Sequence, residues 1–137
     1  MTIKEVRSLI TSAQSIERES KRIKEEIDSL RDELTSVKSS LGGGVVVMSS
    51  ERASTQERVY FRLEELYNQY SAALQRLYDK RAEIESAISA LDPIEQEIVR
   101  AWRDGKTEEE IGATVGYSRR SIQYKKKRIL IRLAEIN

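Results

Sequence analysis

The first 41 residues contain neither glycine nor proline, and along them an apolar or small side chain recurs at gaps that alternate between three and four. This spacing is a heptad repeat, which suits a helix and not a strand, because side chains on a strand alternate with a period of two. Thr2 and Glu5 have the spacing of a capping box at a helix start. The sequence therefore predicts one long coiled-coil helix, and its repeat consists of Val6, Leu9, Ala13, Ile16, Ser20, Ile23, Ile27, Leu30, Leu34, Val37 and Leu41.

A second heptad repeat predicts a second long helix, from about Ser54 to Leu91, where Ser54 and Glu57 are spaced as a capping box. Its positions are Tyr60, Leu63, Tyr67, Tyr70, Leu74, Leu77, Arg81, Ile84, Ile88 and Leu91. Two long helices joined by one loop, residues 42–53, are expected to fold back as an antiparallel hairpin. We therefore predict a coiled-coil domain over residues 1–91.

The loop contains the stretch GGGVVVM, in which the glycines end the first helix. The valines and methionine could form a short strand or cover the end of the hairpin, and the residues alone do not decide between the two. A phosphate-binding loop is not expected, because no Gly-Lys-Ser/Thr follows the glycines.

The second helix carries more apolar positions than a two-helix hairpin needs. Val59, Leu66, Ala73 and Ala87 recur at one further heptad position beside the predicted contact line. Either the C-terminal helices or a second copy of the chain could cover this extra width. We predict a dimer.

Composition excludes several classes of function. The chain has no Cys and no His, so a thiol nucleophile, an imidazole base and an ordinary zinc site are all absent. We accordingly expect no enzymatic activity, no metal and no cofactor. One Pro, six Gly and 34% charged residues favour an all-α protein. No apolar run approaches the roughly 20 residues of a membrane span, and no signal peptide opens the chain, so we expect a cytoplasmic protein without membrane contact.

Residues 92–137 predict a second domain of three shorter helices. Asp92 opens the first helix and Thr107 the second, each followed three residues later by Glu, and Ser118 caps the last one. Gly116 separates the second helix from the third. Two short helices joined by a turn that contains glycine are typical of a helix-turn-helix unit. The buried stripe of its last helix is expected to comprise Ile122, Ile129, Leu130, Leu133 and Ile136.

Positive charge is concentrated at the end of the chain. Residues 1–118 hold 17 Lys/Arg and 22 Asp/Glu, whereas residues 119–137 hold 7 Lys/Arg and a single acid, Glu135. The last helix of a helix-turn-helix unit enters the DNA major groove by its N-terminal end, where Arg can pair with guanine and Gln with adenine. The residues expected to read bases are Arg119, Arg120, Gln123, Tyr124 and Lys127. Those expected to bind phosphates are Lys106, Thr107, Tyr117, Ser118, Ser121, Lys126, Arg128 and Arg132.

The C-terminal third resembles region four of bacterial sigma factors, through the stretches LDPIEQEIV, GKTEEEIGATVGYSRRSI and RILIRL. The longer arrangement, a helical first half followed by this unit, resembles phage late-transcription regulators of the ArpU and RinA type. The resemblance implies that Arg119, Arg120, Gln123, Tyr124 and Lys127 match positions that read promoter bases. The sequence departs from the sigma pattern at Gly112, which stands where Ala is usual, and the exchange is expected to weaken that helix by about 1 kcal/mol.

These observations predict a sequence-specific transcription regulator that binds double-stranded DNA. The phage resemblance implies a late-gene activator that acts with host RNA polymerase in the bacterial cytoplasm. Two other binding roles stay open: a DNA-packaging protein similar to the small subunit of a phage terminase, and a structural coiled-coil adaptor. A ring-sized assembly would indicate the first, and a failure to bind any duplex at low salt would indicate the second.

Overall fold

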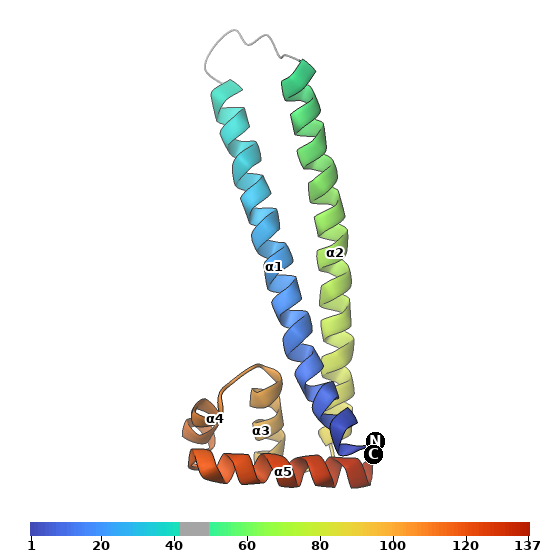
Figure 1. Ribbon diagram of the computed structural model, residues 1–137, viewed down its shortest axis with the longest axis vertical. Helices are drawn as coiled ribbons and strands as arrows, with labels where there is room; N and C mark the ends of the chain where they lie inside the picture. The colour runs from blue at the N-terminus through green and yellow to red at the C-terminus, as the bar shows by residue number, and fades with distance from the viewer. Residues whose placement is uncertain (42–49) are drawn as a thin grey trace. The chain divides into compact units, whose positions relative to one another are not determined.

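The computed structural model describes the backbone of residues 1–41 and 50–137 and the side chains of residues 1–35 and 55–137. Two long helices are followed by three shorter ones, and the described residues form no strand (Figure 1). The all-α prediction is therefore confirmed. The helices are α1 (Ile3–Leu41), α2 (Ser50–Ile88), α3 (Pro93–Arg103), α4 (Glu108–Val115) and α5 (Arg119–Ile136).

The predicted capping residues begin four of the five helices. The backbone N–H of Glu5 donates to Thr2 Oγ1 at 3.2 Å, so α1 begins as predicted. Complete capping boxes open α3 at Asp92 and α4 at Thr107. Ser118 caps α5 by accepting a hydrogen bond from the backbone N–H of residue 121 at 3.2 Å. Local sequence alone therefore locates these four helix starts, since each cap satisfies backbone donors that the first turn leaves unpaired.

The predicted bounds of the second helix are wrong at both ends. The helix α2 begins at Ser50, four positions before the predicted cap at Ser54, so residues 50–53 are helical and do not belong to the loop. It ends at Ile88, where the backbone turns and the N–H of Leu91 donates to the Ile88 carbonyl at 3.0 Å. The GGGVVVM stretch lies outside the described residues.

The described chain forms two compact units. The hairpin unit comprises Arg18–Gln75, and the composite unit comprises Met1–Glu17 together with Arg76–Asn137. Both long helices contribute to both units. The boundary between the units thus differs from the sequence-based division after residue 91. The reason is that the N-terminal end of α1 and the C-terminal end of α2 pack with the C-terminal helices.

In the hairpin unit, α1 contacts a different face of α2 from the predicted one. Val59, Leu66 and Ala73 are buried in one apolar cluster with Ile23 and Ile27 of α1. The predicted contact positions are instead partly exposed to solvent, with relative exposures of 50% for Tyr60, 40% for Tyr67 and 42% for Leu74. Leu63 and Tyr70 are the two residues of α2 that belong both to the predicted heptad repeat and to this buried cluster.

The side chains themselves explain this rotation. Val59, Leu66 and Ala73 carry no polar atom, whereas a tyrosine buried against α1 would need a partner for its hydroxyl group. Ala73 is fully buried in the same cluster, where its small side chain fits between the two helices. Tyr67 stays at the surface, where its ring lies 5.5 Å from the guanidinium of Arg31 in a cation–π contact.

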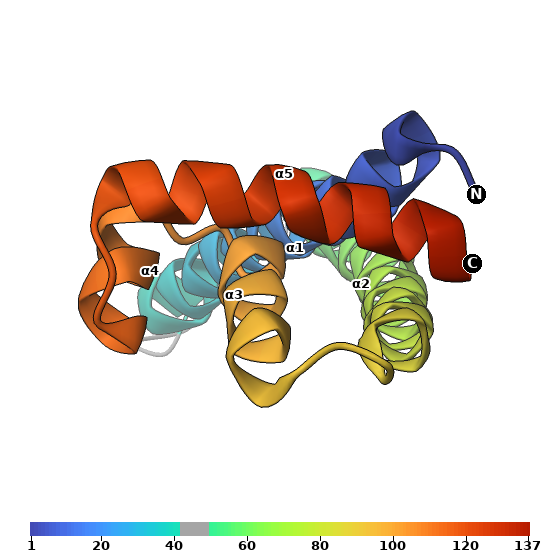
Figure 2. The same ribbon diagram turned by 90° about the horizontal axis from the view of Figure 1, so that it is seen from below.

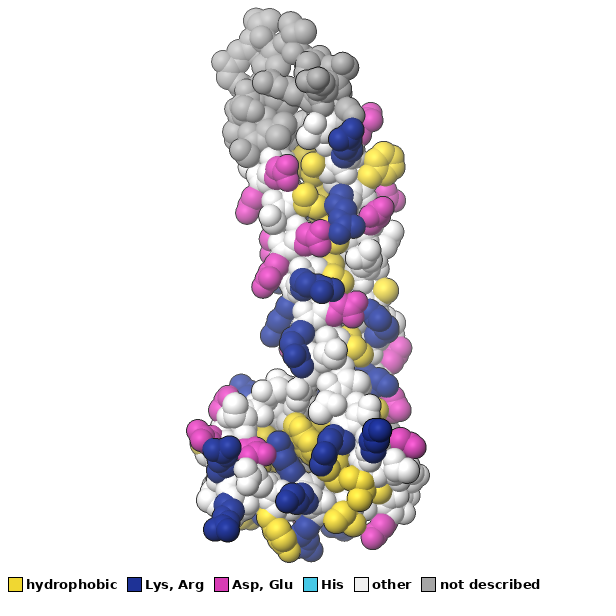
Figure 3. Space-filling view, viewed as in Figure 1, with side chains coloured by type: hydrophobic (Ala, Val, Ile, Leu, Met, Phe, Trp, Pro, Cys, Tyr) yellow, Lys and Arg dark blue, Asp and Glu magenta, His cyan; other side chains and the backbone are white. Residues whose placement is uncertain are grey.

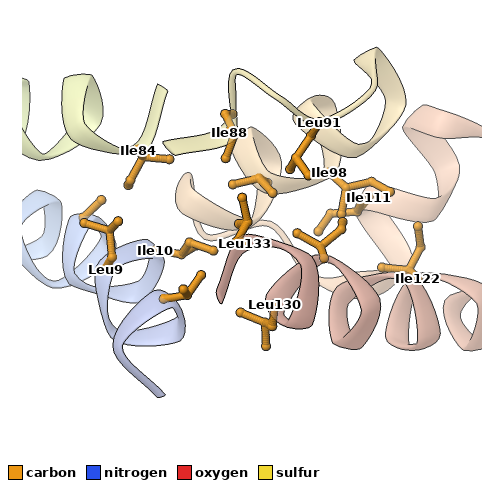
Figure 4. Close-up of a cluster of buried hydrophobic side chains, with 14 of the residues drawn as sticks. Leu9, Ile10, Ile84, Ile88, Leu91, Ile98, Ile111, Ile122, Leu130 and Leu133 are labelled. Carbon is orange, nitrogen blue, oxygen red and sulfur yellow. The ribbon is translucent and has the colours of Figure 1, made fainter. Parts of the chain in front are cut away.

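The composite unit has one apolar core to which every helix contributes (Figure 4). Leu9 and Ile10 are among the members from α1, Ile84 and Ile88 among those from α2, and each of the three C-terminal helices also contributes. Ile10 was absent from the predicted heptad repeat, yet only 1% of its surface is exposed. The helix-turn-helix thus shares its core with the first turns of the chain, and its buried members are Ile98, Val99, Ile111, Ile122, Ile129, Leu130 and Leu133. Ile136, expected in this stripe, is 48% exposed and is the last residue of α5.

Hydrogen bonds and ion pairs tie the same segments together. The side-chain amide of Gln14 in α1 donates to the carbonyl oxygen of Trp102 in α3. Glu85 of α2 accepts from Arg100 at 2.8 Å and from Arg103 at 3.0 Å, and these bonds lower the pKa of its carboxyl group. Polar and apolar contacts therefore agree on which segments make up the composite unit. None of the described helices is long and apolar enough to cross a membrane.

Candidate nucleic-acid interface

The helices α4 and α5 form the predicted helix-turn-helix within the composite unit, with α3 packed against both (Figure 2). Gly116 ends α4 in the left-handed region, at a φ of 82°, which residues with a β-carbon rarely adopt. The N–H groups of Gly116 and Tyr117 both donate to the Gly112 carbonyl, at 2.8 and 2.9 Å. The chain therefore folds back tightly over the last turn of α4.

This tight turn gives Gly112 a role that the sequence did not reveal. A β-carbon at position 112 would overlap the backbone carbonyl oxygen of Tyr117 and would also touch Ile122. Glycine is thus required by the close approach of the turn to α4. The sequence-based expectation considered only the helix propensity of Gly112, and the packing of the turn adds a steric requirement that it did not include.

Exposed polar and cationic side chains form a stripe along α5, opposite its buried isoleucines and leucines. Arg120, Gln123, Tyr124 and Lys127 are all exposed, at spacings of three and four that place them on one face of the helix. Within the described part of the chain, neither Arg120 nor Lys127 forms an ion pair. Cationic side chains are also visible over the C-terminal helices in Figure 3. The predicted solvent-facing surface of α5 is thus present.

Two of the predicted base-reading residues have partners inside the protein. Arg119 is exposed, but its Nε lies 3.6 Å from Glu108 and its guanidinium also pairs with Glu109 at 3.6 Å. Gln123 lines the same pocket as Glu108, and the polar interaction with its side chain is the largest cause of the lowered pKa of the Glu108 carboxyl group. Both side chains therefore lie near the N-terminal turn of α4 as well as on the exposed surface of α5.

Lys126, which is expected to bind phosphate, is mostly buried. Only 16% of its side chain is exposed, and its ammonium group lies 4.4 Å from the centre of the Trp102 ring and 3.7 Å from Glu108. Burial lowers the pKa of Lys126, and the nearby carboxylate of Glu108 partly opposes that effect. The structure thus gives Lys126 a position between α3, α4 and α5.

The other predicted phosphate ligands divide into exposed cations and capping residues. Arg128 is exposed and stacks 5.8 Å from the Tyr124 ring. Arg132 forms an ion pair with Glu95 at 2.9 Å, and Lys106 a long one with Glu110 at 3.9 Å.

The hydroxyl groups of Thr107 and Ser118 cap α4 and α5, and Ser121 shares the Ser118 cap. Tyr117 is exposed beside the ammonium group of Lys125, at 4.6 Å from its ring centre. The capping residues lie at helix N-termini, where backbone N–H groups also favour anions.

A shallow pocket of about 330 Å³ opens beside the stripe. It joins residues from α1, α3, α4 and α5, namely Arg7, Trp102, Glu108, Gln123, Lys126, Lys127 and Leu130. Sequence reasoning missed Arg7, Trp102 and Glu108 as members of this surface. The acidic run Glu108–Glu110, next to a basic helix in the same unit, was the available signal for Glu108.

Among the described residues, no group of three or more acidic side chains could hold a metal ion. Comparison of the chain with protein-family models, with curated proteins and with solved structures gives no significant match.

Proposed function

We propose that this protein is a transcription regulator that binds double-stranded DNA in a sequence-specific manner through α5. The observation that carries the proposal is the exposed stripe of Arg120, Gln123, Tyr124 and Lys127 at the N-terminal half of the second helix of a helix-turn-helix. That half of the helix enters the major groove in this class of DNA-binding unit. The resemblance to sigma region four supports a role beside host RNA polymerase, in the bacterial cytoplasm, and the phage resemblance supports late-gene activation.

The direct test is selection of a preferred duplex from a random library by the full chain, followed by titration at several salt concentrations. We expect one enriched sequence, bound about 10³-fold or more tightly than random duplex. Log affinity should fall linearly with log salt concentration, because phosphate contacts release counterions. Failure to bind any duplex at low salt, or selection without enrichment, would contradict the proposal.

The stripe and the flanking cations should respond differently to substitution. Replacing Arg120 by Ala removes an exposed side chain that faces away from the core, so affinity for the selected duplex should fall by about 1–3 kcal/mol with little change on random duplex. Replacing Arg128 by Ala should weaken both duplexes equally and reduce the salt slope by about one. Titration of both variants against both duplexes measures the difference. If both variants lost the same affinity on both duplexes, the stripe would bind DNA only through its charge and would not read bases.

We also propose that the protein is a homodimer, through an exposed stripe on the hairpin unit. Tyr60, Tyr67 and Leu74 are partly exposed and spaced by seven residues along α2. A helix with apolar residues at three of seven positions is typical of a helix with two neighbours, and α1 covers only two of these positions. The regular spacing makes the stripe self-complementary about Tyr67, so a second copy can pack Leu74 against Tyr60 in a symmetric contact. Helix-turn-helix proteins also commonly bind paired half-sites as dimers.

Placing charge in this stripe should give a monomer. A variant with Tyr67→Lys and Leu74→Lys places one positive charge at the centre of the proposed contact and another one heptad away, and both positions are already partly exposed to solvent within one copy. Light scattering at tens of micromolar should give twice 15.8 kDa for the unchanged chain and 15.8 kDa for the variant. Gln69→Lys, on an exposed position of the same helix, is the control and should leave the dimer intact. A monomeric unchanged chain would overturn the dimer proposal.

A further inference from the structure

Glu108 at the start of α4 connects to three side chains of α5. Its carboxylate pairs with Arg119 at 3.6 Å and with Lys126 at 3.7 Å, and it lines the same pocket as Gln123. Two of these three residues belong to the surface expected to read bases. One carboxylate therefore competes with DNA for the residues that DNA would use.

The surroundings of Glu108 favour its charged form and hold the cluster together. Only 27% of the Glu108 side chain is exposed, and its cationic partners, Arg119 and Lys126, lie seven residues apart on the side of α5 that faces it. Lys126, between this carboxylate and the Trp102 ring, has two partners that a phosphate would have to replace. Arg120 and Lys127 have no ion-pair partner in the part of the chain that the structure describes, so they can meet DNA without breaking a contact.

We propose that Glu108 is a specificity-determining residue of the DNA-binding surface: it retains Arg119, Gln123 and Lys126 on the protein. Base reading then falls first to Arg120, Tyr124 and Lys127. This inference rests on the proposed DNA-binding function.

The physical reason is that binding to random DNA depends almost entirely on phosphate electrostatics. A carboxylate that neutralises nearby cations lowers this contribution directly. On the preferred sequence, Arg120, Tyr124 and Lys127 make the base contacts, so binding there depends less on the cations that Glu108 neutralises. Glu108 therefore lowers the affinity for random duplex more than the affinity for the preferred duplex, and this difference raises specificity.

The test compares Glu108→Gln with Glu109→Gln in the full chain. Both variants remove one negative charge from the same helical turn, so bulk charge changes equally. Glu109 differs in being 75% exposed and, among the described residues, in pairing with Arg119 alone. We expect Glu108→Gln to bind random duplex about 3- to 10-fold more tightly than Glu109→Gln, with a salt slope steeper by about one. Affinity for the selected duplex should rise less, so the ratio of specific to random affinity falls. Equal behaviour of the two variants on both duplexes would overturn the inference.

A second variant tests the retention of Lys126 without altering Glu108. Lys126→Gln should reduce random-duplex affinity less than Arg128→Ala does, because Lys126 is held inside the protein and Arg128 is exposed. An equal reduction would show that Lys126 contacts phosphates freely, and it would contradict the inference even if Glu108→Gln failed to fold.

Trp102 supplies a readout that needs no DNA. It is the only Trp in the chain, and Lys126 lies over its ring, so its fluorescence reports on this cluster. The emission should change in Glu108→Gln and stay the same in Glu109→Gln. If the unchanged protein binds no duplex, the proposed function fails. If the unchanged protein binds duplex, but Glu108→Gln and Glu109→Gln have the same Trp102 emission and the same duplex affinities, then only the inference about Glu108 is contradicted.

Discussion

The Ile10→Ala variant is expected to lose about 2–5 kcal/mol of unfolding free energy, the usual cost of emptying a fully buried isoleucine site. Ile10 is 1% exposed and belongs to the same apolar core as Ile98, Leu130 and Leu133 (Figure 4). Removing its side chain therefore opens a cavity against α3 and α5, although Ile10 itself belongs to the first helix. The helix-turn-helix should melt in the same transition as the N-terminal segment.

Chemical denaturation of the full chain, followed by circular dichroism, measures this loss. Ile3→Ala is the matched control, since Ile3 lies on the same helix but is 45% exposed, and we expect a change of less than about 0.5 kcal/mol there. If the two variants lost the same free energy, the first turns of α1 would not belong to the core of the composite unit. DNA affinity at a temperature near the new midpoint should fall along with the folded fraction.

The Gly112→Ala variant is expected to be less stable than the unchanged protein by about 1–3 kcal/mol, the range for overpacking a tight contact. In an ordinary helix interior the same exchange gains about 1 kcal/mol, so the predicted sign is reversed. The reason is steric: the new β-carbon would overlap the Tyr117 carbonyl oxygen, and relief requires the turn to move away from α4. That movement would lengthen the hydrogen bonds from Gly116 and Tyr117 to residue 112.

Ala113→Gly is the matched control for this variant. Position 113 is exposed on the same helix, so this exchange should cost about 1 kcal/mol through helix propensity alone. Thermal unfolding of both variants then separates propensity from packing. If Gly112→Ala were more stable than the unchanged chain, the turn after α4 could move away from the new β-carbon without a loss of unfolding free energy, and the prediction would be wrong. DNA binding gives a second readout, because displacement of the turn alters how α5 is presented.

Much of the local structure followed from sequence patterns that need no tertiary information. A helix start depends on a few neighbouring residues, which is why the caps at Asp92, Thr107 and Ser118 could be predicted. The solvent-facing side of α5 could be predicted for a similar reason, since a period of 3.6 residues separates its charged side chains from its apolar ones.

The contact face of α2 could not be predicted in this way. Two heptad positions, one containing Tyr60 and Tyr67 and the other Val59 and Leu66, flank the same shared positions and fit the repeat equally well. The choice depends on what α1 offers across the interface, on how the small side chain of Ala73 fits between the helices, and on the cost of burying tyrosine hydroxyl groups.

The sequence by itself thus determined the helical class, most helix starts and the exposed surface of α5, because these depend on residues within a turn or two of one another. Only the tertiary structure decided that Ile10 completes the core beneath the helix-turn-helix, and that Gly112 must accommodate the Tyr117 carbonyl. It also decided that Glu108 holds Arg119 and Lys126. These are contacts between separate helices, and their geometry is set by packing, which no local period encodes.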